Sequence, residues 1–175
     1  MEGVALRAWP EMPALQPPNL AEVWRGDPAE WRLVHAWLGP LIGGSATLLL
    51  PGFLTDGGSI PRAAWRIAGH PFQLPCLAYF LAHDADYAGE LRGREECDRR
   101  LLEGMRLDGT VPAAKRLLIH RAVRRGGWAP WARHTPEGIA EARKHCRAVG
   151  EEEFYALAEG RSTLMRQAGL KNDRA

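Results

Sequence analysis

A histidine and two aspartates lie close together in one segment of the sequence and could do acid–base or metal chemistry. His83 and Asp84 are adjacent, Tyr87 follows one helical turn later, and Asp98 comes after a short turn. An imidazole is the usual general base near neutral pH, and a carboxylate beside it can fix its tautomer. Carboxylates are also ligands for divalent cations. The segment therefore predicts a group that activates water, holds a cation, or does both.

A second polar segment, residues 53–62, lies about thirty residues upstream. Asp56 adds a third carboxylate to the set. Gly57 and Gly58 follow it and permit backbone conformations that are closed to other residues. We predict that this glycine-rich loop and the His83 segment form one site.

Ser59 and Arg62 complete the loop and are candidates for contacts to substrate. Ser59 stands where it can cap a short helix that tolerates Pro61 in its first turn. A helix start of this kind can also present backbone N–H groups to an anion. No elbow motif surrounds Ser59, so we interpret it as a cap and not as a nucleophile. Arg62 could contact an anionic substrate, and a plain salt bridge explains it equally well.

Helical geometry assigns different roles to the two aspartates near His83. Adjacent residues on a helix diverge in direction by about 100°, so Asp84 cannot orient His83 and is better placed to bind a cation. Asp98, on the next helix, is the predicted orienter, and Asp56 joins Asp84 around the cation. The alternative is a buried polar network that fixes the helix pair without catalysis.

The pattern along the chain predicts an α+β fold that is mainly α. The pattern predicts a hairpin with strands over residues 31–37 and 47–50, followed by the loop that contains Asp56. Apolar residues at helical spacing predict helices over 75–87, 94–105 and 112–125, and a short connection favours antiparallel packing of the first two. A fourth helix is expected to open with Thr135 as cap and Pro136 at its first position.

We expect one globular domain over residues 30–150. Residues 1–29 are rich in Pro and Trp and predict an irregular arm. Residues 151–175 predict a C-terminal helical extension with a frayed tail after Gly160.

Composition restricts the partners and the compartment. The 23 Lys and Arg nearly balance the 21 Asp and Glu. The chain therefore has no strong net positive charge that would indicate nucleic-acid binding. No apolar run approaches a membrane span. Three cysteines without metal-ligand spacing fit a reducing compartment, and we expect synthesis in the cytoplasm. Four other histidines show no pairing at metal-ligand spacing and are expected to be surface or capping residues: His70, His120, His134 and His145.

The ordered set of motifs resembles a family of bacteriophage and prophage proteins, domain of unknown function thirteen-fifty-three. The resemblance covers roughly residues 30 to 131. It implies a phage or prophage origin, and the family carries no established activity to transfer. The motifs are the run at 52–62, His83-Asp84-x-x-Tyr87, Arg94, Asp98, Met105, Arg121-Ala122-Val123-Arg124 and Trp131.

The His-Asp-x-x-Tyr helix is also similar to the phospholipase A2 superfamily. There the His activates a water, the neighbouring Asp binds calcium with a glycine-rich loop, and an Asp from an antiparallel helix holds the His. The similarity implies calcium near Asp84, Asp56, Gly57 and Gly58. The chain departs from that superfamily in two ways. Those phospholipases are mostly secreted and disulfide-bonded, whereas Cys76 and Cys97 lack an obvious set of partners. The amino-acid sequence of the glycine-rich loop also differs from that of their calcium-binding loop.

Two functions from different classes follow. The first is a metal-assisted hydrolase that acts on an envelope lipid or related ester during phage entry or lysis. The second is a noncatalytic virion or assembly component in which the same residues form a structural network. An enzyme requires His83 in an open cleft with a nitrogen directed to solvent, whereas a structural network is closed and fully hydrogen-bonded.

Overall fold

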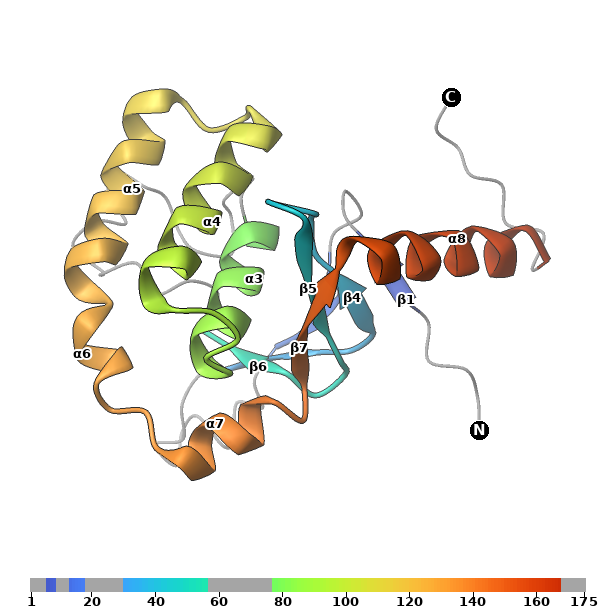
Figure 1. The fold of residues 1–175 in the computed structure, drawn as a ribbon, viewed down its shortest axis with the longest axis horizontal. Helices are drawn as coiled ribbons and strands as arrows, with labels where there is room; N and C mark the ends of the chain where they lie inside the picture. The colour runs from blue at the N-terminus through green and yellow to red at the C-terminus, as the bar shows by residue number, and fades with distance from the viewer. Residues whose placement is uncertain (1–5, 9–12, 18–29, 57–76, 168–175) are drawn as a thin grey trace.

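The computed structural model describes residues 6–8, 13–17, 30–56 and 77–167. Within these ranges the chain forms two small β-sheets and a set of helices, which confirms the predicted α+β class with mainly α content (Figure 1). Residues 57–76 fall outside the described ranges. The short helix expected after Ser59 therefore cannot be compared with the structure.

The larger sheet has four strands in the order β1-β4-β5-β7. Its strands are β1 (Leu6–Ala8), β4 (Ala36–Leu38), β5 (Ser45–Leu49) and β7 (Cys146–Gly150). β1 pairs with β4 in parallel, and the other neighbours are antiparallel. The smaller sheet is antiparallel in the order β2-β3-β6, formed by β2 (Leu15–Gln16), β3 (Trp31–Leu33) and β6 (Leu54–Thr55).

The predicted hairpin exists as β4 and β5, but its first strand is not continuous. The predicted strand over 31–37 is wrong because the chain changes sheets at Val34 and His35: β3 pairs with β6, whereas β4 pairs with β5. At the change, the Val34 N–H donates to the Ala14 carbonyl at 3.0 Å. Gly43 and Gly44 both have positive φ, 59° and 76°, which is the backbone of a tight hairpin turn and favours glycine.

The helices follow the sequence pattern closely between Leu77 and Gly126. They are α3 (Leu77–Ala88), α4 (Arg94–Asp108) and α5 (Ala113–Gly126). α4 ends at Gly109, whose φ of 72° is the left-handed C-cap conformation. The last predicted helix is present as α7 (Pro136–Ala142), and the Thr135 hydroxyl caps it by accepting from the Gly138 N–H at 3.1 Å.

Three elements of the C-terminal third differ from the prediction or were not anticipated. α6 (Trp128–Trp131) is a single short turn. β7 adds an edge to the larger sheet, although only its Cys146 and Val149 are buried. α8 (Glu151–Gln167) forms the expected C-terminal helix but continues past Gly160, where we had predicted fraying.

The core lies on both sides of α3, which is placed between the sheets and the other helices (Figure 1). One cluster joins α3 to the strands: Leu33, Trp37, Leu49, Phe53, Ala78, Leu81, Ala85 and Cys146. A second cluster joins α3 to α4 and α5: Tyr79, Phe80, Leu101, Leu102, Met105, Val111, Ile119 and Val123. α3 is therefore nearly surrounded, and polar groups on it must find partners inside the protein.

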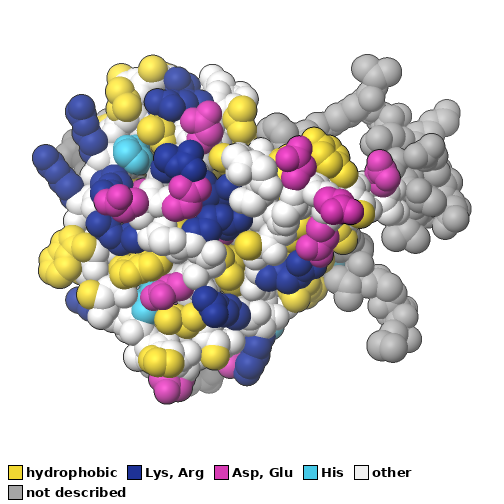
Figure 2. Space-filling model, viewed as in Figure 1, with side chains coloured by type: hydrophobic (Ala, Val, Ile, Leu, Met, Phe, Trp, Pro, Cys, Tyr) yellow, Lys and Arg dark blue, Asp and Glu magenta, His cyan; other side chains and the backbone are white. Residues whose placement is uncertain are grey.

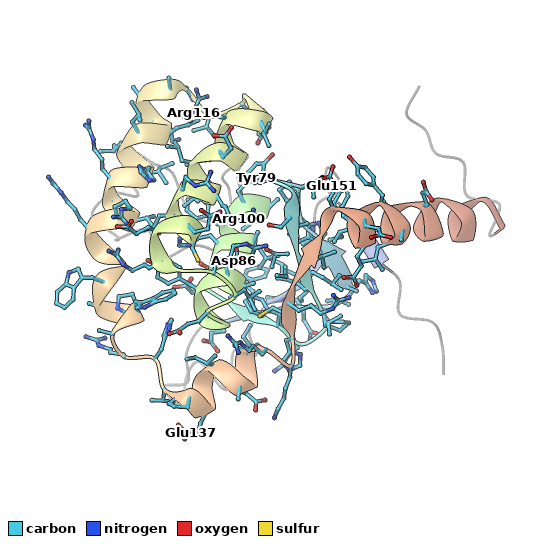
Figure 3. The ribbon with its side chains drawn as sticks, in the orientation of Figure 1. Tyr79, Asp86, Arg100, Arg116, Glu137 and Glu151 are labelled. Atoms are coloured by element: carbon cyan, nitrogen blue, oxygen red, sulfur yellow. The ribbon has the colours of Figure 1, made fainter. Side chains whose placement is uncertain are left out.

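Asp86 on α3 is the centre of a buried polar cluster that ties the helices to β5 (Figure 3). The Thr47 hydroxyl donates to Asp86 Oδ1 at 2.7 Å, and Arg92 forms an ion pair with the same oxygen. Arg100 Nε lies 3.4 Å from Asp86 Oδ2, and its Nη2 donates to the Ser45 carbonyl at 3.0 Å. Burial raises the pKa of Asp86, against the opposing effects of Arg92 and Thr47.

The surface shows no gathering of one charge sign on the face drawn in Figure 2, where Lys and Arg alternate with Asp and Glu. Several positive side chains are paired within a helix turn or with a neighbouring element, as in Arg99 with Glu96 and Arg124 with Glu95. None of the described helices has the length and apolar character needed to cross a membrane.

Gly104 marks the closest approach of α3 and α4. A Cβ at this position would overlap the Tyr79 ring, with Cε1 only 2.8 Å away. We expect Gly104→Ala to destabilise the fold by about 1–3 kcal/mol despite the better helix propensity of alanine. Gly160→Ala on exposed α8 is the control, since a Cβ there meets nothing within 4 Å. Urea unfolding should show the control unchanged or slightly more stable, and equal effects at both sites would contradict this packing.

Candidate active site

His83 and Asp98 form a hydrogen-bonded pair between α3 and α4. His83 Nε2 lies 3.0 Å from Asp98 Oδ1. The short connection between the helices brings the start of α4 beside the second half of α3, as the spacing predicted. Asp98 is therefore the carboxylate that orients the imidazole.

Asp98 is itself held from the side opposite His83. It is fully buried, and Arg124 Nη1 from α5 donates to its Oδ2 at 3.2 Å. Arg94 Nη1 lies 3.7 Å from the same oxygen. Burial alone would raise the pKa of Asp98, but its hydrogen bonds to His83 and Arg124 hold that pKa below the usual value. Asp98 is thus a fixed negative charge behind the imidazole.

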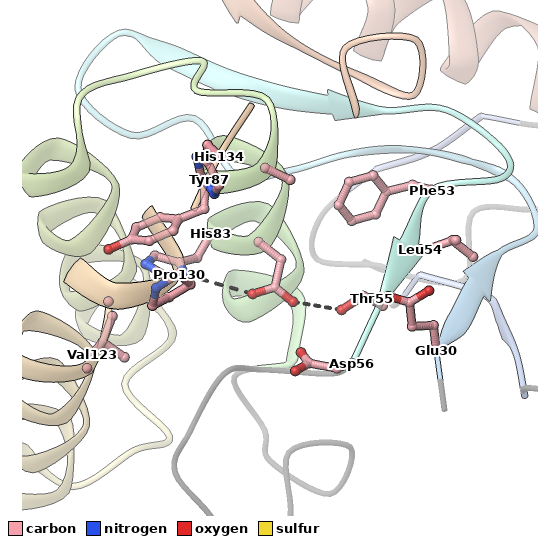
Figure 4. Close-up of a pocket in the computed structure, with 14 residues that line it drawn as sticks. Glu30, Phe53, Leu54, Thr55, Asp56, His83, Tyr87, Val123, Pro130 and His134 are labelled. Carbon is pink, nitrogen blue, oxygen red and sulfur yellow. Dashed lines mark hydrogen bonds and ion pairs between the residues drawn. The ribbon is translucent and has the colours of Figure 1, made fainter. Parts of the chain in front are cut away.

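Asp84 faces the second nitrogen of His83 from a greater distance. His83 Nδ1 lies 3.9 Å from Asp84 Oδ1, which is an ion-pair distance but too long for a hydrogen bond. Asp84 Oδ2 accepts from the Thr55 hydroxyl at 2.7 Å (Figure 4). This contact joins the strand before the glycine-rich loop to α3, so Asp56 at the end of that strand lies near the His83 segment.

The imidazole of His83 has a strongly raised pKa. Burial of the ring by itself lowers the pKa, but the close contact and negative charge of Asp84 and the hydrogen bond and charge of Asp98 outweigh it and raise the value to about 9. At neutral pH the ring is therefore mostly the imidazolium, which can donate a proton but cannot accept one.

His83 lines a pocket of about 510 Å³ between the smaller sheet, α3 and the α5–α6 connection. Figure 4 shows polar groups and apolar groups side by side on its walls. The His83 side chain retains 4% of its exposure, so only a small part of the ring reaches the pocket. The lining residues are Glu30, Phe53, Leu54, Thr55, Asp56, His83, Asp84, Tyr87, Ala88, Val123, Gly126, Gly127, Pro130 and His134.

Tyr87 packs over His83. Its ring centroid lies 4.6 Å from that of His83, and Trp131 meets the other part of the ring edge-on at 4.9 Å. Its hydroxyl packs directly against Gly127. Burial, together with the negative charge of Asp98, raises the pKa of Tyr87 to about 12. The phenol is therefore neutral, and Tyr87 positions the rings around it.

Four predicted site residues lie outside the described ranges: Gly57, Gly58, Ser59 and Arg62. Among the described residues, no group of three or more His, Cys, Asp or Glu side chains is arranged to hold a metal ion. Asp84 and Asp56 share a pocket wall, but the first already uses one oxygen for Thr55. The predicted cation site is thus not assembled from the described side chains.

The structure adds residues that the sequence analysis did not select. Glu30 and Thr55 line the pocket from the smaller sheet, and His134 lines it from the segment after α6. We had expected His134 to be a surface or capping residue, yet its Nδ1 lies 2.9 Å from Glu90 Oε1. The separation of 44 residues between these two leaves no local sequence signal for the pair.

Comparisons with known proteins bear on none of these assignments. No protein-family model matches the chain, no curated protein matches it, and no solved structure matches its fold. The phage-family and phospholipase resemblances therefore stay predictions from the motifs. The function rests on the geometry of the site.

Proposed function

We propose that the protein is a phage- or prophage-encoded hydrolase that uses the His83–Asp98 pair to move a proton at an ester bond. The observation that carries the proposal is an imidazole held by a buried carboxylate at the wall of an open pocket. A buried aspartate behind a histidine is the arrangement by which hydrolases orient an imidazole and stabilise its charged form. The origin rests on the motif resemblance alone.

The raised pKa of His83 favours the role of proton donor at neutral pH. Nε2 is occupied by Asp98, so the proton available to a substrate is the one on Nδ1. In ester hydrolysis the leaving oxygen must gain a proton as its bond to carbon breaks, and an imidazolium can supply it. This role differs from that of general base, which we expected from the sequence.

The lining of the pocket favours a neutral or zwitterionic ester with an apolar portion. Phe53, Leu54, Val123 and Pro130 offer an apolar wall. Glu30, Asp56 and Asp84 place three carboxylates around the same space, which disfavours a purely anionic ligand. An envelope lipid ester fits this combination.

The noncatalytic alternative is supported by a continuous chain of polar contacts. Thr55, Asp84, His83, Asp98 and Arg124 are linked in that order and join β6, α3, α4 and α5. Such a chain would stabilise the fold of a virion or assembly component without any turnover.

Calcium at Asp84 and Asp56 stays a prediction, and no step of the proposed chemistry passes through it. A cation that binds only the folded protein must raise its Tm. A calcium-dependent rise that EDTA reverses and Asp84→Asn abolishes would support the site. Equal Tm values with calcium and with EDTA would count against it.

The proposal predicts that His83→Gln lowers turnover by a factor of about 10²–10⁴ while the fold is kept. Hydrolysis should be measured on short-chain esters and on phospholipid vesicles, with circular dichroism to check folding. His120→Gln, on the outer part of α5, is the matched control and should behave as the wild type. If the wild type hydrolyses no ester, the noncatalytic alternative is favoured.

Asp84→Asn should shift the pH profile of the same reaction. A general acid must be protonated, so kcat/KM should fall above about pH 9, near the pKa of His83. Asp84 raises that pKa through its charge and its contact to the ring, so removing the charge should move the alkaline limb to lower pH. An unmoved limb would show that His83 is not the group that titrates.

A further inference from the structure

A second histidine–carboxylate pair lies at the same pocket. His134 lines the pocket, and its Nδ1 lies 2.9 Å from Glu90 Oε1. No other hydrogen bond of the His134 ring joins it to a described residue. Both side chains are partly exposed, with 19% for His134 and 32% for Glu90, so this pair is accessible where the His83–Asp98 pair is buried.

The backbone that presents Glu90 is strained and braced. Its φ of 42° makes it the one described non-glycine residue in the left-handed region. The Glu90 N–H donates to the Tyr87 carbonyl at 3.0 Å, which closes the turn after α3. From the end of α7, Arg143 donates to the carbonyls of Gly89 and Glu90 at 2.7 and 3.2 Å. Strain of this kind persists where surrounding contacts over-determine it, and it is frequent at functional sites.

Tyr87 lies between the two histidines. His83 packs on its ring with centroids 4.6 Å apart, and His134 meets it perpendicularly with centroids 6.4 Å apart. Trp131 packs against both Tyr87 and His134, at 4.9 and 5.2 Å, and fixes the second imidazole relative to the first. The two pairs are thus parts of one packed group of rings.

The carboxylate partner determines the tautomer of the second imidazole. An ionised carboxylate only accepts hydrogen bonds, so Nδ1 of His134 must carry the hydrogen that it shares with Glu90. In the neutral ring the lone pair is then on Nε2. His134 therefore has a ring nitrogen, Nε2, that can accept a proton.

We propose that His134 is the general base of the pocket and that Glu90 is its positioning residue. This inference rests on the proposed hydrolase function and deepens it. It supplies the proton acceptor that water attack requires.

The resulting reaction balances. Nε2 of His134 takes a proton from water while the water oxygen bonds to the ester carbonyl carbon, giving a tetrahedral oxyanion. As the oxyanion collapses, the bond from carbon to the alcohol oxygen breaks, and that oxygen receives the Nδ1 proton of His83. Release of acid and alcohol leaves a protonated His134 and a neutral His83. Solvent then removes the first proton and restores the second.

The first test reads the tautomer without any substrate. In ¹⁵N-detected NMR of the full chain, the neutral form of His134 should carry its proton on Nδ1. Glu90→Gly should remove this preference at His134 and leave the His83 signals unchanged. A His134 ring protonated at Nε2 in the wild type would overturn the proposal whatever the activity.

The second test measures turnover of the same esters. His134→Gln should lower kcat by a factor of about 10²–10⁴, as expected for a general base, and His120→Gln should not. An active wild type with an equally active His134→Gln would overturn this inference alone. An inactive wild type would overturn the proposed function with it.

Glu90→Gly separates a positioning role from a structural one. Glycine adopts positive φ without strain, so the variant should keep or raise the Tm. If Glu90 positions the base, kcat should nevertheless fall at least tenfold with little change in KM, and Glu90→Asp or Glu90→Gln should recover part of the loss. A Glu90→Gly variant with wild-type kcat would show that the glutamate serves no catalytic purpose.

Discussion

Replacing Asp86 by asparagine should destabilise the protein by about 3–5 kcal/mol, the usual cost of breaking a buried ion pair from one side. Asp86 is 1% exposed and is the carboxylate partner of both Arg92 and Arg100. Without it, Arg100 stays buried beside Ser45 and loses its ion-pair partner. The variant should show a large drop in the urea midpoint.

An exposed ion pair provides the matched control. Glu103 and Arg106 are paired on the surface of α4, the helix that carries Arg100, with Glu103 Oε2 and Arg106 Nη1 3.1 Å apart. Glu103→Gln removes one negative charge, as Asp86→Asn does, but exposed pairs contribute only about 0–1 kcal/mol. If the two variants lose similar free energies of unfolding, the Asp86 cluster is not the clamp that joins α3 and α4 to β5.

The free energy of unfolding of the wild type should fall as the pH rises from 6 to 9 because of His83. Its folded-state pKa of about 9 lies above the ordinary value of 6.5 for an unperturbed histidine. The folded protein therefore binds this proton more tightly, and the stability it contributes is fully present below pH 6.5 and lost as the pH rises through about 9. At about 1.4 kcal/mol per tenfold change in acidity, this amounts to about 3 kcal/mol, most of it lost by pH 8.5.

His83→Gln should remove most of this dependence. The variant should be less stable than the wild type at pH 6 and approach it near pH 9, in chemical denaturation at each pH. Measurements should be compared below pH 8.5, because burial raises the pKa of Cys97 and Cys146 to about 12 and these thiols add a further loss at higher pH. His120→Gln is the control: burial lowers the pKa of His120, so its contribution falls below pH 6.5. Parallel pH curves for the wild type and His83→Gln would contradict the raised pKa.

The two clusters on α3 therefore differ in purpose. Asp86 accepts from the Thr47 hydroxyl of β5 and pairs with Arg92 and Arg100, which in turn donate to backbone carbonyls of β5. Asp86 does not line the His83 pocket, so its cluster serves the fold. His83 lies three residues earlier and reaches the pocket. Variants at the two positions should separate accordingly: Asp86→Asn should lose stability at every pH from 6 to 9, and His83→Gln mainly at the lower end.

The sequence by itself determined the elements whose signals are local. Apolar residues at helical spacing located α3, α4 and α5 to within a few residues, because one buried face is enough to specify an amphipathic helix. The pairing of His83 with Asp98 followed from the short connection between two such helices. The Thr135 cap was also predicted, since it depends on only a few neighbouring residues.

Only the tertiary structure decided which distant short segments meet. β7 pairs with β5 from about a hundred residues away. The predicted strand over 31–37 divides between two sheets, because three-residue strands are too short to show a sequence period. Glu90 meets His134 across 44 residues, and Asp84 meets Thr55 across 29. The charge of His83 could not be predicted from the sequence either, since the pKa of a buried group depends on how much water is excluded and on which charges surround it. Local spacing places a side chain on its helix, but desolvation and long-range contacts decide whether that side chain gives or takes a proton.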